Sequence, residues 1–241
     1  MPRPGLLSCA LLLSFTACAT ATAAAPPPPP LPPPRVARAA PMPPAPPAEP
    51  AAPSLREQVV ERAASALGRL RLSAVTREVS DDCTGFARWA YRASGEDLVE
   101  GSVGNMLSMA SRARALRRGG RPLPGDLVFF RETYDRNRDR RRDDGVTHVG
   151  VVERVEPDGT VVFAHRASSG VKESRLNLRF PSTARADDGR VLNDYIRRAS
   201  GKRRGRLTGE QFAGYADLEA LYRNRLSAAP VARAGPSNRG R

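Results

Sequence analysis

The uneven distribution of proline is the feature that most limits what this chain can fold into. Seventeen of its 23 prolines fall within residues 1–53, and six lie in the rest of the chain. A segment so rich in Pro and Ala, with almost no large apolar side chain after Phe15, cannot bury enough surface to offset the entropy of ordering it. We therefore expect the folded part to begin near Ser54 and to form one domain of ordinary size.

Residues 1–25 have the pattern of an export signal. A single arginine precedes a short apolar core at residues 6–15, and small residues follow. The core is shorter than the roughly 20 residues that a membrane-spanning helix needs. The sequence FTAC at residues 15–18 resembles a bacterial lipobox, which would make Cys18 a lipidated N-terminus and membrane anchor. Simple cleavage after an Ala-x-Ala sequence is the alternative.

Residues 26–53 are predicted to be a disordered tether. They hold 15 prolines, and Pro-rich chain favours polyproline II, which extends ~3.1 Å per residue. A spacer that holds a domain away from a membrane fits this stretch, and a flexible linker without a function is the alternative. We expect a periplasmic or outer-membrane lipoprotein, or otherwise a secreted protein.

The hydrophobic pattern predicts helices first and strands afterwards. The helices begin with a capping box at Ser54 and continue at residues 83–94 and 105–118. Short apolar runs predict strands at residues 126–130, 148–155, 160–165 and 190–196. A hairpin at residues 157–159 joins the middle two strands. Helices followed by an antiparallel sheet indicate an α+β fold.

A further helix and a disordered tail are predicted near the C-terminus. A capping box at residues 208–211 precedes an apolar stripe that predicts a helix packed on the domain, formed by Phe212, Tyr215, Leu218 and Leu221. We assign residues 54–198 to the domain, residues 199–226 to a basic linker and amphipathic helix, and residues 227–241 to a disordered tail.

The formal net charge is +14, and many arginines gather at residues 112–121 and 197–206. Such patches favour anionic partners, which are nucleic acid, acidic lipid or an acidic wall polymer. Export argues against nucleic acid. A solvated basic surface without a partner is the alternative.

Cysteine use narrows the chemistry. Cys9 and Cys18 lie in the signal region, so Cys83 alone remains in the folded part, which cannot form an internal disulfide. A lone thiol in an oxidising compartment is a liability unless it is buried or used. Cys83 lies at a predicted helix start, where amides and the helix dipole stabilise a thiolate and lower the thiol pKa. The same amides can hold a developing oxyanion.

The chain has two histidines, His148 and His165, on two consecutive predicted strands. Adjacent antiparallel strands can bring the two rings within hydrogen-bond reach. That arrangement supplies a base beside the thiol of Cys83 and a second group that orients the base. Taken singly, a strand histidine is usually a satisfied polar residue, and a lone cysteine is usually a small core residue.

The sequence resembles a known family in four segments, which are Asp82–Phe86, Pro124–Phe130, His148–Val152 and Phe163–His165. They come in the order seen in NlpC-type cell-wall cysteine peptidases, and the related CHAP amidases and peptidases share the same papain-like core. The resemblance covers about residues 55–198. It implies an α+β papain-like fold with the nucleophile at a helix N-terminus, packed on an antiparallel sheet.

The resemblance also implies roles. Cys83 is then the nucleophile, His148 the general base and His165 the residue that orients it, while Asp82 and Thr84 help to read the peptide stem of peptidoglycan. NlpC-type enzymes usually cut between D-glutamate and a diamino acid, and the CHAP comparison also allows the muramoyl-alanine amide or a cross-bridge. We expect no cofactor, no nucleic acid and a monomer.

Two departures from the family pattern stand out. The family often has a Tyr and paired glycines shortly before its Asp-Cys, whereas residues 71–80 offer neither. An insertion at about residues 131–146 also lengthens the spacing between Cys83 and His148. Its alternating oxygen-bearing residues are similar to a calcium loop, and they are Asp135, Asn137, Asp139 and Asp143.

The calcium pattern is incomplete. Arg140 stands where the turn glycine of such a loop belongs, and Val146 stands where a glutamate would close it. A self-paired, solvated loop of arginines and acids explains the composition more simply. We therefore expect no metal.

Three functions follow from these residues. The first is an exported bacterial cell-wall hydrolase that cleaves a stem-peptide amide through an acyl-enzyme. The second is a papain-like acyltransferase or lipid-acting enzyme with the same triad, which an apolar groove beside Cys83 would favour. The third is a non-catalytic wall-binding protein, and the intact set of one cysteine and two histidines argues against it.

Overall fold

The structure is a computed structural model that describes residues 52–95, 99–141, 143–199 and 204–228. The predicted export signal, Cys18, nearly all of the predicted tether and residues 229–241 lie outside the described residues. None of the described helices is long and apolar enough to cross a membrane.

The described chain forms a six-stranded antiparallel sheet and a separate pair of short strands. The strand order across the large sheet is β1-β8-β2-β3-β4-β5. Its strands are β1 (Leu116–Arg117), β2 (Leu127–Arg131), β3 (Val146–Val155), β4 (Val161–Ala167), β5 (Gly170–Leu176) and β8 (Phe212–Ala216). The separate pair consists of β6 (Tyr195–Arg197) and β7 (Arg206–Leu207).

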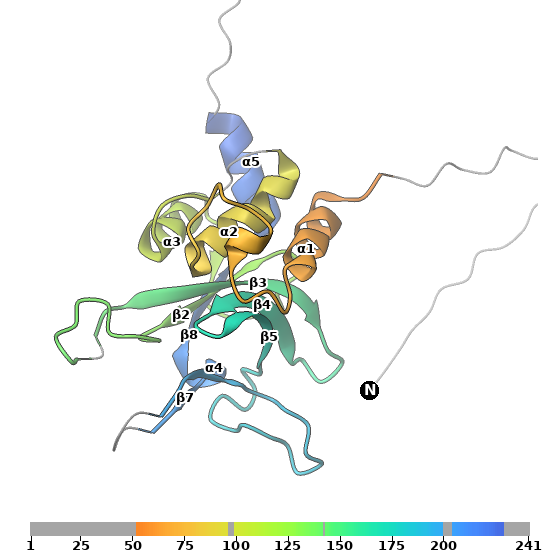
Figure 1. Cartoon of the computed structure of the whole chain (residues 1–241). Coiled ribbons are helices and arrows are strands. Elements are labelled where there is room, and N and C mark those ends of the chain that lie inside the picture. The colour runs from red at the N-terminus through yellow and green to blue at the C-terminus, as the bar shows by residue number, and fades with distance from the viewer. Residues whose placement is uncertain (1–51, 96–98, 142, 200–203, 229–241) are drawn as a thin grey trace, which may run out of the picture. The chain divides into compact units, whose positions relative to one another are not determined.

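Helices cover one face of the large sheet (Figure 1). They are α1 (Leu55–Ser65), α2 (Cys83–Tyr91), α3 (Val103–Arg112) and α5 (Leu218–Ala228), whereas the short α4 (Thr208–Gln211) lies on the other face with β7. Two 3-10 turns cover Leu72–Ala74 and Arg92–Ser94. The predicted α+β class with an antiparallel sheet is confirmed.

Local sequence explains where the helices begin and end. Ser54 and Glu57 form the predicted capping box, in which each residue bonds the backbone amide of the other at the start of α1. At the far end of α2, Gly95 takes a left-handed conformation with φ of 78°. Glycine adopts that conformation without the steric cost a side chain would add, so the helix stops there.

The sheet separates two hydrophobic clusters. The larger cluster lies between the helices and the sheet, and it includes Phe86, Met106, Phe129 and Leu218. The smaller cluster lies on the opposite face and contains Val128, Phe130, Val152, Val161, Phe163, Leu176 and Tyr215. Because β2 to β4 are covered on both faces, they read in sequence as nearly continuous apolar runs rather than as alternating ones.

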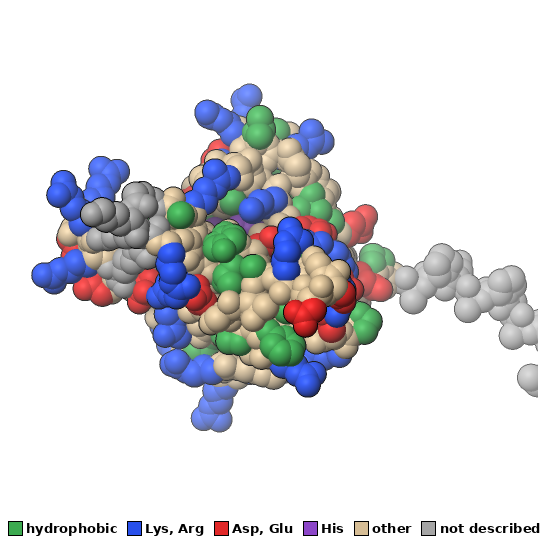
Figure 2. All heavy atoms as spheres, turned by 90° about the horizontal axis from the view of Figure 1, so that it is seen from below, with side chains coloured by type: hydrophobic (Ala, Val, Ile, Leu, Met, Phe, Trp, Pro, Cys, Tyr) green, Lys and Arg blue, Asp and Glu red, His purple; other side chains and the backbone are tan. Residues whose placement is uncertain are grey.

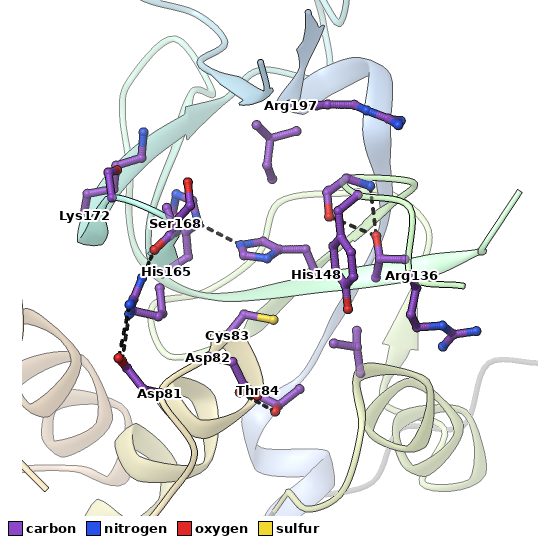
Figure 3. A pocket seen from close by; sticks show the side chains of 18 of the residues that line it. Asp81, Asp82, Cys83, Thr84, Arg136, His148, His165, Ser168, Lys172 and Arg197 are labelled. Atoms are coloured by element: carbon purple, nitrogen blue, oxygen red, sulfur yellow. Dashed lines mark hydrogen bonds and ion pairs between the residues drawn. The ribbon is translucent and has the colours of Figure 1, made fainter. Parts of the chain in front are cut away.

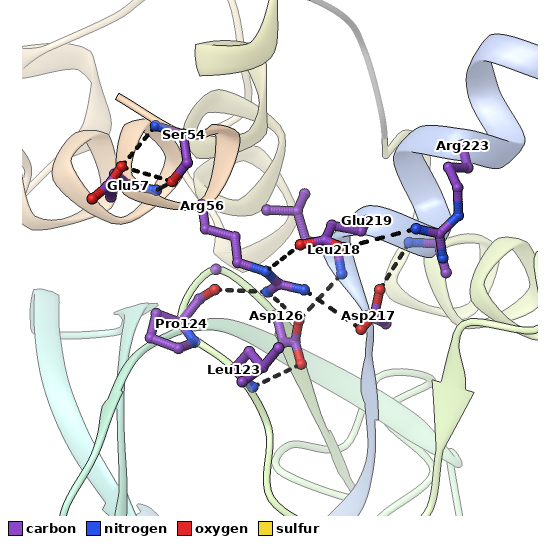
Figure 4. A network of polar contacts seen from close by, with 12 residues as sticks. Ser54, Arg56, Glu57, Leu123, Pro124, Asp126, Asp217, Leu218, Glu219 and Arg223 are labelled. Carbon is purple, nitrogen blue, oxygen red and sulfur yellow. Dashed lines mark hydrogen bonds and ion pairs between the residues drawn. The ribbon is translucent and has the colours of Figure 1, made fainter. Parts of the chain in front are cut away.

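A buried carboxylate joins the two ends of the folded region (Figure 4). Asp126, which is fully buried just before β2, accepts hydrogen bonds from Arg56 at 2.8 Å and from Arg117 at 2.7 Å. It also accepts from the backbone amides of Leu123 and Leu218. Since Arg56 is on α1 and Leu218 begins α5, this one side chain fastens both terminal helices to the sheet.

The third predicted helix extends too far at its C-terminal end. It was expected to reach Arg118, but α3 ends at Arg112 and Leu116 pairs with Ala216 of β8. Arg114 has φ of 54°, which breaks the helical path. Pairing with a strand nearly 100 residues later overrides the helical pattern of this segment.

The C-terminal prediction needs the larger correction. Residues 212–216 were expected to open a helix, yet they form β8 between β1 and β2. Residues 199–226 are therefore not merely a linker and helix, and the folded region extends past residue 198 to α5. Of the strand expected at residues 190–196, only β6 is formed, and β5 was missed because charged side chains interrupt its apolar positions.

Candidate active site

The fold places Cys83 at the first turn of α2, as the sequence predicted. Asp82 caps this helix by accepting a hydrogen bond from the backbone amide of Gly85 at 2.8 Å. Gly85 is required by a close approach, because a Cβ there would lie 1.8 Å from the backbone oxygen of Ser80. The tight packing of this loop on the helix fixes the position of Cys83.

The two histidines meet across neighbouring strands of the sheet. His148 on β3 and His165 on β4 are buried, and Nε2 of His148 lies 2.7 Å from Nδ1 of His165. Their ring planes are nearly perpendicular, at 89°. Gly150 on β3 leaves the space for this pair, since a Cβ there would lie 2.7 Å from the Phe163 ring and 3.3 Å from the Cβ of His165.

A buried serine extends the pair into a row of three side chains. The hydroxyl of Ser174 on β5 lies 3.0 Å from Nε2 of His165. When His165 donates from Nε2 to Ser174, its Nδ1 accepts the proton of His148 Nε2. This assignment leaves Nδ1 of His148 with a lone pair, which is what a base for the thiol requires.

Cys83, His148 and His165 line one pocket of about 830 Å³. Figure 3 shows the sulfur of Cys83 beneath the His148 ring, with His165 on the other side of the dashed bond. The structure thus brings together the three predicted catalytic side chains. Asp82 and Thr84 also line this pocket.

The charge state of the thiol differs from the expectation. The pKa of Cys83 is raised to about 11, chiefly by burial and to a lesser extent by the nearby Asp82 carboxylate. The amide of Val149 and the amides at the start of α2 lower the pKa by bonding the sulfur. Burial outweighs them, so the predicted net lowering of the thiol pKa is wrong.

Both histidines are held neutral. Burial lowers the pKa of His148 to about 4, although Asp82 partly opposes it. Burial also lowers the pKa of His165 well below its ordinary range, helped by His148 and Lys172. The pair at neutral pH is therefore a thiol and a neutral imidazole.

Asp82 and Thr84 are bonded to each other. The Thr84 hydroxyl donates to the Asp82 carboxylate at 2.6 Å, and Ser80 donates to the same oxygen at 3.0 Å. Burial works to raise the pKa of Asp82, but the hydrogen bonds from Thr84, Gly85 and Ser80 outweigh it and lower the pKa. A charged Asp82 thus faces the pocket beside Cys83 while it caps α2.

Several pocket residues escaped the sequence reasoning. Two exposed tyrosines line the pocket, Tyr134 from the insertion and Tyr195 from β6. The pKa of Tyr134 is raised by burial and also by Cys83, so an aromatic residue does lie near the thiol, although residues 71–80 supply none. Tyr134 is the single aromatic residue in a charged insertion, and that isolation is the one sequence signal that could have pointed to it.

Polar pocket residues were missed as well. Arg166 forms an ion pair with Asp81 at 2.9 Å, which lowers the pKa of Asp81 and joins β4 to the loop before α2. Lys172 and Ser174 belong to β5, which the sequence did not reveal. Their roles depend on the register of β5 against β4, and no short-range pattern encodes that register.

The suggested calcium ligands bond their own loop. Asp135 accepts from the Arg140 amide, Asn137 from the Asp139 amide and Asp139 from the Arg141 amide. Among the residues that the structure describes, no group of three or more His, Cys, Asp or Glu side chains could hold a metal ion. These bonds form turns within the loop, as in a self-paired loop.

The part of the chain that holds this site is similar to known proteins. The sequence matches the CHAP domain family over residues 74–166. No curated protein matches the chain. Among solved structures, NlpC1 from Trichomonas vaginalis is 21% identical with a TM-score of 0.32, over 49% of this chain and 38% of that one. The part of the chain that is similar to the CHAP domain family, residues 74–166, holds Cys83 and both histidines.

Proposed function

We propose that this protein is an exported bacterial cell-wall hydrolase that cleaves an amide bond in the peptide stem of peptidoglycan. The match of residues 74–166 to the CHAP domain family supports a cell-wall amidase or peptidase. The observation that carries the proposal is the 2.7 Å contact between His148 and His165, in the pocket that also holds Cys83 at a helix N-terminus. These are the parts of a thiol acyl-transfer site.

The proposed reaction has two halves. His148 takes the thiol proton as the sulfur of Cys83 attacks the amide carbon, and the new S–C bond replaces the C–N bond. The protonated His148 gives that proton to the departing amine. A water molecule, deprotonated by His148, then attacks the acyl-enzyme, and the thiol is restored as the acid leaves.

Two neighbouring groups support the transition state. His165, held by Ser174, keeps the His148 ring in place and accepts its Nε2 proton. The backbone amides of Cys83 and Thr84 at the start of α2 approach the sulfur and lower its pKa. Amides so placed can also stabilise the oxyanion that develops on the attacked carbonyl.

The pocket lining bears on the lipid-acting alternative. An acyl chain needs a large apolar groove, whereas this pocket is lined mainly by charged, hydroxyl and histidine side chains. The lining favours a polar substrate such as a peptide stem. The catalytic set itself favours an enzyme over a wall-binding protein.

A digestion experiment tests the proposal. The full chain is incubated with purified peptidoglycan beside the Cys83→Ala variant, and soluble fragments are identified by mass spectrometry. We expect new amine ends from the wild type and none from the variant, and the fragment masses name the bond. Absence of new ends, or equal release by Cys83→Ala, contradicts the hydrolase function.

The membrane anchor is a separate proposal that rests on residues 15–18. If Cys18 is lipidated, labelled palmitate enters the full-length protein in bacterial cells and fails to enter the Cys18→Ala variant. Equal labelling of the two proteins, or labelling of neither, favours simple secretion.

A further inference from the structure

The pocket that holds Cys83 carries more positive than negative charge. Five cationic side chains line it, against two carboxylates. The cations are Arg136, Arg166, Lys172, Arg197 and Arg198, and the carboxylates are Asp81 and Asp82. Figure 2 shows a histidine at the surface of this face with Lys and Arg side chains beside it. A cleft lined by one sign of charge raises the local concentration of ligands of the opposite sign.

Not all of these charges are available to a ligand. Arg166 is paired with Asp81 at 2.9 Å, and Arg136 bonds the Asp144 carboxylate through its backbone amide and lies 4.0 Å from it through its side chain. Arg197 donates to the backbone oxygen of Glu132. These groups are already held by the protein.

Lys172 and Arg198 differ from these three arginines, because neither has an ion pair within the described part of the chain, and of the two it is Lys172 that lies beside the histidine pair. Within the described part of the chain, no carboxylate forms an ion pair with Lys172, and its side chain is exposed. The register of β4 and β5 places it directly opposite His165. Its charge is close enough to contribute to the low pKa of that ring. Lys172 therefore places an ammonium group on the His165 side of Cys83, with no ion-pair partner among the residues that the structure describes (Figure 3).

We propose that this pocket selects substrates with a free carboxylate near the scissile amide, and that Lys172 is the residue that recognises it. This inference rests on the proposed function, because it names the substrate class of the same site. The carboxylate lies on the β5 side of Cys83, where it pairs with the ammonium group of Lys172. A carboxamide at that position leaves Lys172 unpaired and gains no charge-assisted hydrogen bond.

A matched pair of substrates tests the selection. Two synthetic stem peptides differ only in carrying free carboxylates or carboxamides beside the scissile bond, and kcat and KM are measured with the full chain. We expect kcat/KM to be about tenfold higher for the carboxylate peptide, mainly through KM, as a charge-assisted hydrogen bond allows. Equal kcat/KM for the two peptides overturns the inference.

Three variants assign the effect to Lys172. Lys172→Gln is expected to remove the discrimination, and Lys172→Arg is expected to keep most of it. Arg225→Gln removes an exposed charge on α5, outside this pocket, and is expected to leave the discrimination unchanged. Discrimination that survives in Lys172→Gln, or is lost equally in Arg225→Gln, contradicts the role of Lys172.

A binding measurement separates this inference from the proposed function. Isothermal titration of both peptides into Cys83→Ala reports recognition without turnover. Carboxylate-selective binding that Lys172→Gln abolishes, without hydrolysis by the wild type, sustains the selection and refutes the hydrolase. Hydrolysis that depends on Cys83 without carboxylate selectivity sustains the hydrolase and refutes the selection.

Discussion

Nε2 of His148 lies 2.7 Å from Nδ1 of His165, although the two residues belong to different strands and are 17 positions apart. The contact gives the two histidines unequal roles. His148 has one ring nitrogen left for the thiol, whereas both nitrogens of His165 are engaged, one by His148 and one by Ser174. In the proposed reaction, His165 is therefore expected to act as a positioning residue.

Replacing His165 tests this division of roles. We expect His165→Ala to lower kcat on the order of 10²-fold, near the lower end of what a positioned acid–base group contributes. His148→Ala is expected to be less active still. His165→Asn keeps a polar group for His148 and is expected to recover part of the loss, so kcat of the three variants is compared. A His165→Ala enzyme with wild-type kcat contradicts the role.

The pH dependence of activity follows from the two pKa shifts. The active form needs His148 neutral, so activity is expected to rise as pH increases through about 4. Activity is expected to persist until pH approaches 11, where Cys83 loses its proton without His148. A kcat/KM profile measured from pH 3 to pH 10 checks the width of the plateau. An acid limb near the ordinary histidine pKa of about 6.5 contradicts it.

Gly150 offers a test of the packing beneath the histidines. Gly150→Ala places a methyl group 2.7 Å from the Phe163 ring and 3.3 Å from the Cβ of His165. We expect this overpacking to cost about 1–3 kcal/mol of unfolding free energy and to lower kcat by displacing His165. Urea denaturation and kinetics measure the two effects.

A second glycine supplies the matched control. Gly104 lies within α3, and the nearest atom to an added Cβ is 3.8 Å away. Gly104→Ala is therefore expected to raise the unfolding free energy, by up to about 1 kcal/mol, and to leave kcat unchanged. If Gly104→Ala lowers the unfolding free energy as much as Gly150→Ala does, the loss in Gly150→Ala does not come from overpacking against Phe163 and His165.

Much of the site could be predicted from the sequence because its chemistry depends on local features. A cysteine at a capped helix start and two histidines on one hairpin are short-range patterns. The thiol pKa was mispredicted because the helix dipole is visible in sequence, whereas the burial that outweighs it comes from the packed pocket. The places of Tyr134, Tyr195 and Lys172 in the pocket depend on how the insertion, β6 and β5 pack around Cys83, which no short-range pattern encodes.

In the fold as well, short-range features were predicted correctly and long-range pairing was not. Capping at Ser54 and the hairpin at residues 157–159 were predicted correctly because the signal lies within a few residues. The strand at residues 212–216 was read as helix because its apolar spacing fits either period. Its pairing partners, β1 and β2, lie more than 80 residues earlier in the chain. Hydrogen bonding to these two strands makes the segment a strand rather than a helix.

Removing the buried carboxylate of Asp126 is expected to destabilise the protein strongly. Asp126→Ala leaves the largely buried Arg56 without its carboxylate partner at 2.8 Å. It also leaves the backbone amides of Leu123 and Leu218 without the acceptor that Asp126 provides. Breaking one side of a buried pair costs about 3–5 kcal/mol, measured by urea denaturation at pH 7. Asp188→Ala, which breaks an exposed pair with Arg190, is the control and is expected to cost at most about 1 kcal/mol. Equal losses in the two variants contradict the importance of burial.

Glu153 predicts an unusual dependence of stability on pH. Burial raises its pKa to about 7, so the folded protein binds a proton that the unfolded chain has released above about pH 4.5. Stability is therefore expected to fall as pH rises from about 4.5 to 7, whereas the stability that the lowered pKa of Glu173 contributes is gained as pH rises to about 4.5 and leaves this fall unchanged. Glu153→Gln should flatten this fall in denaturation curves. An identical pH profile in the variant contradicts the assignment.

The position of β8 also sets the order in which this protein can assemble. β8 is hydrogen-bonded to β1 on one side and to β2 on the other. Until residue 216 is present, β1 is therefore separated from the four strands β2 to β5. Contacts of such long sequence separation form late because the chain must first close a large loop. β8, the last strand to be synthesised, is thus the strand that connects β1 to the rest of the sheet. A nascent chain cannot complete the sheet until β8 has been synthesised.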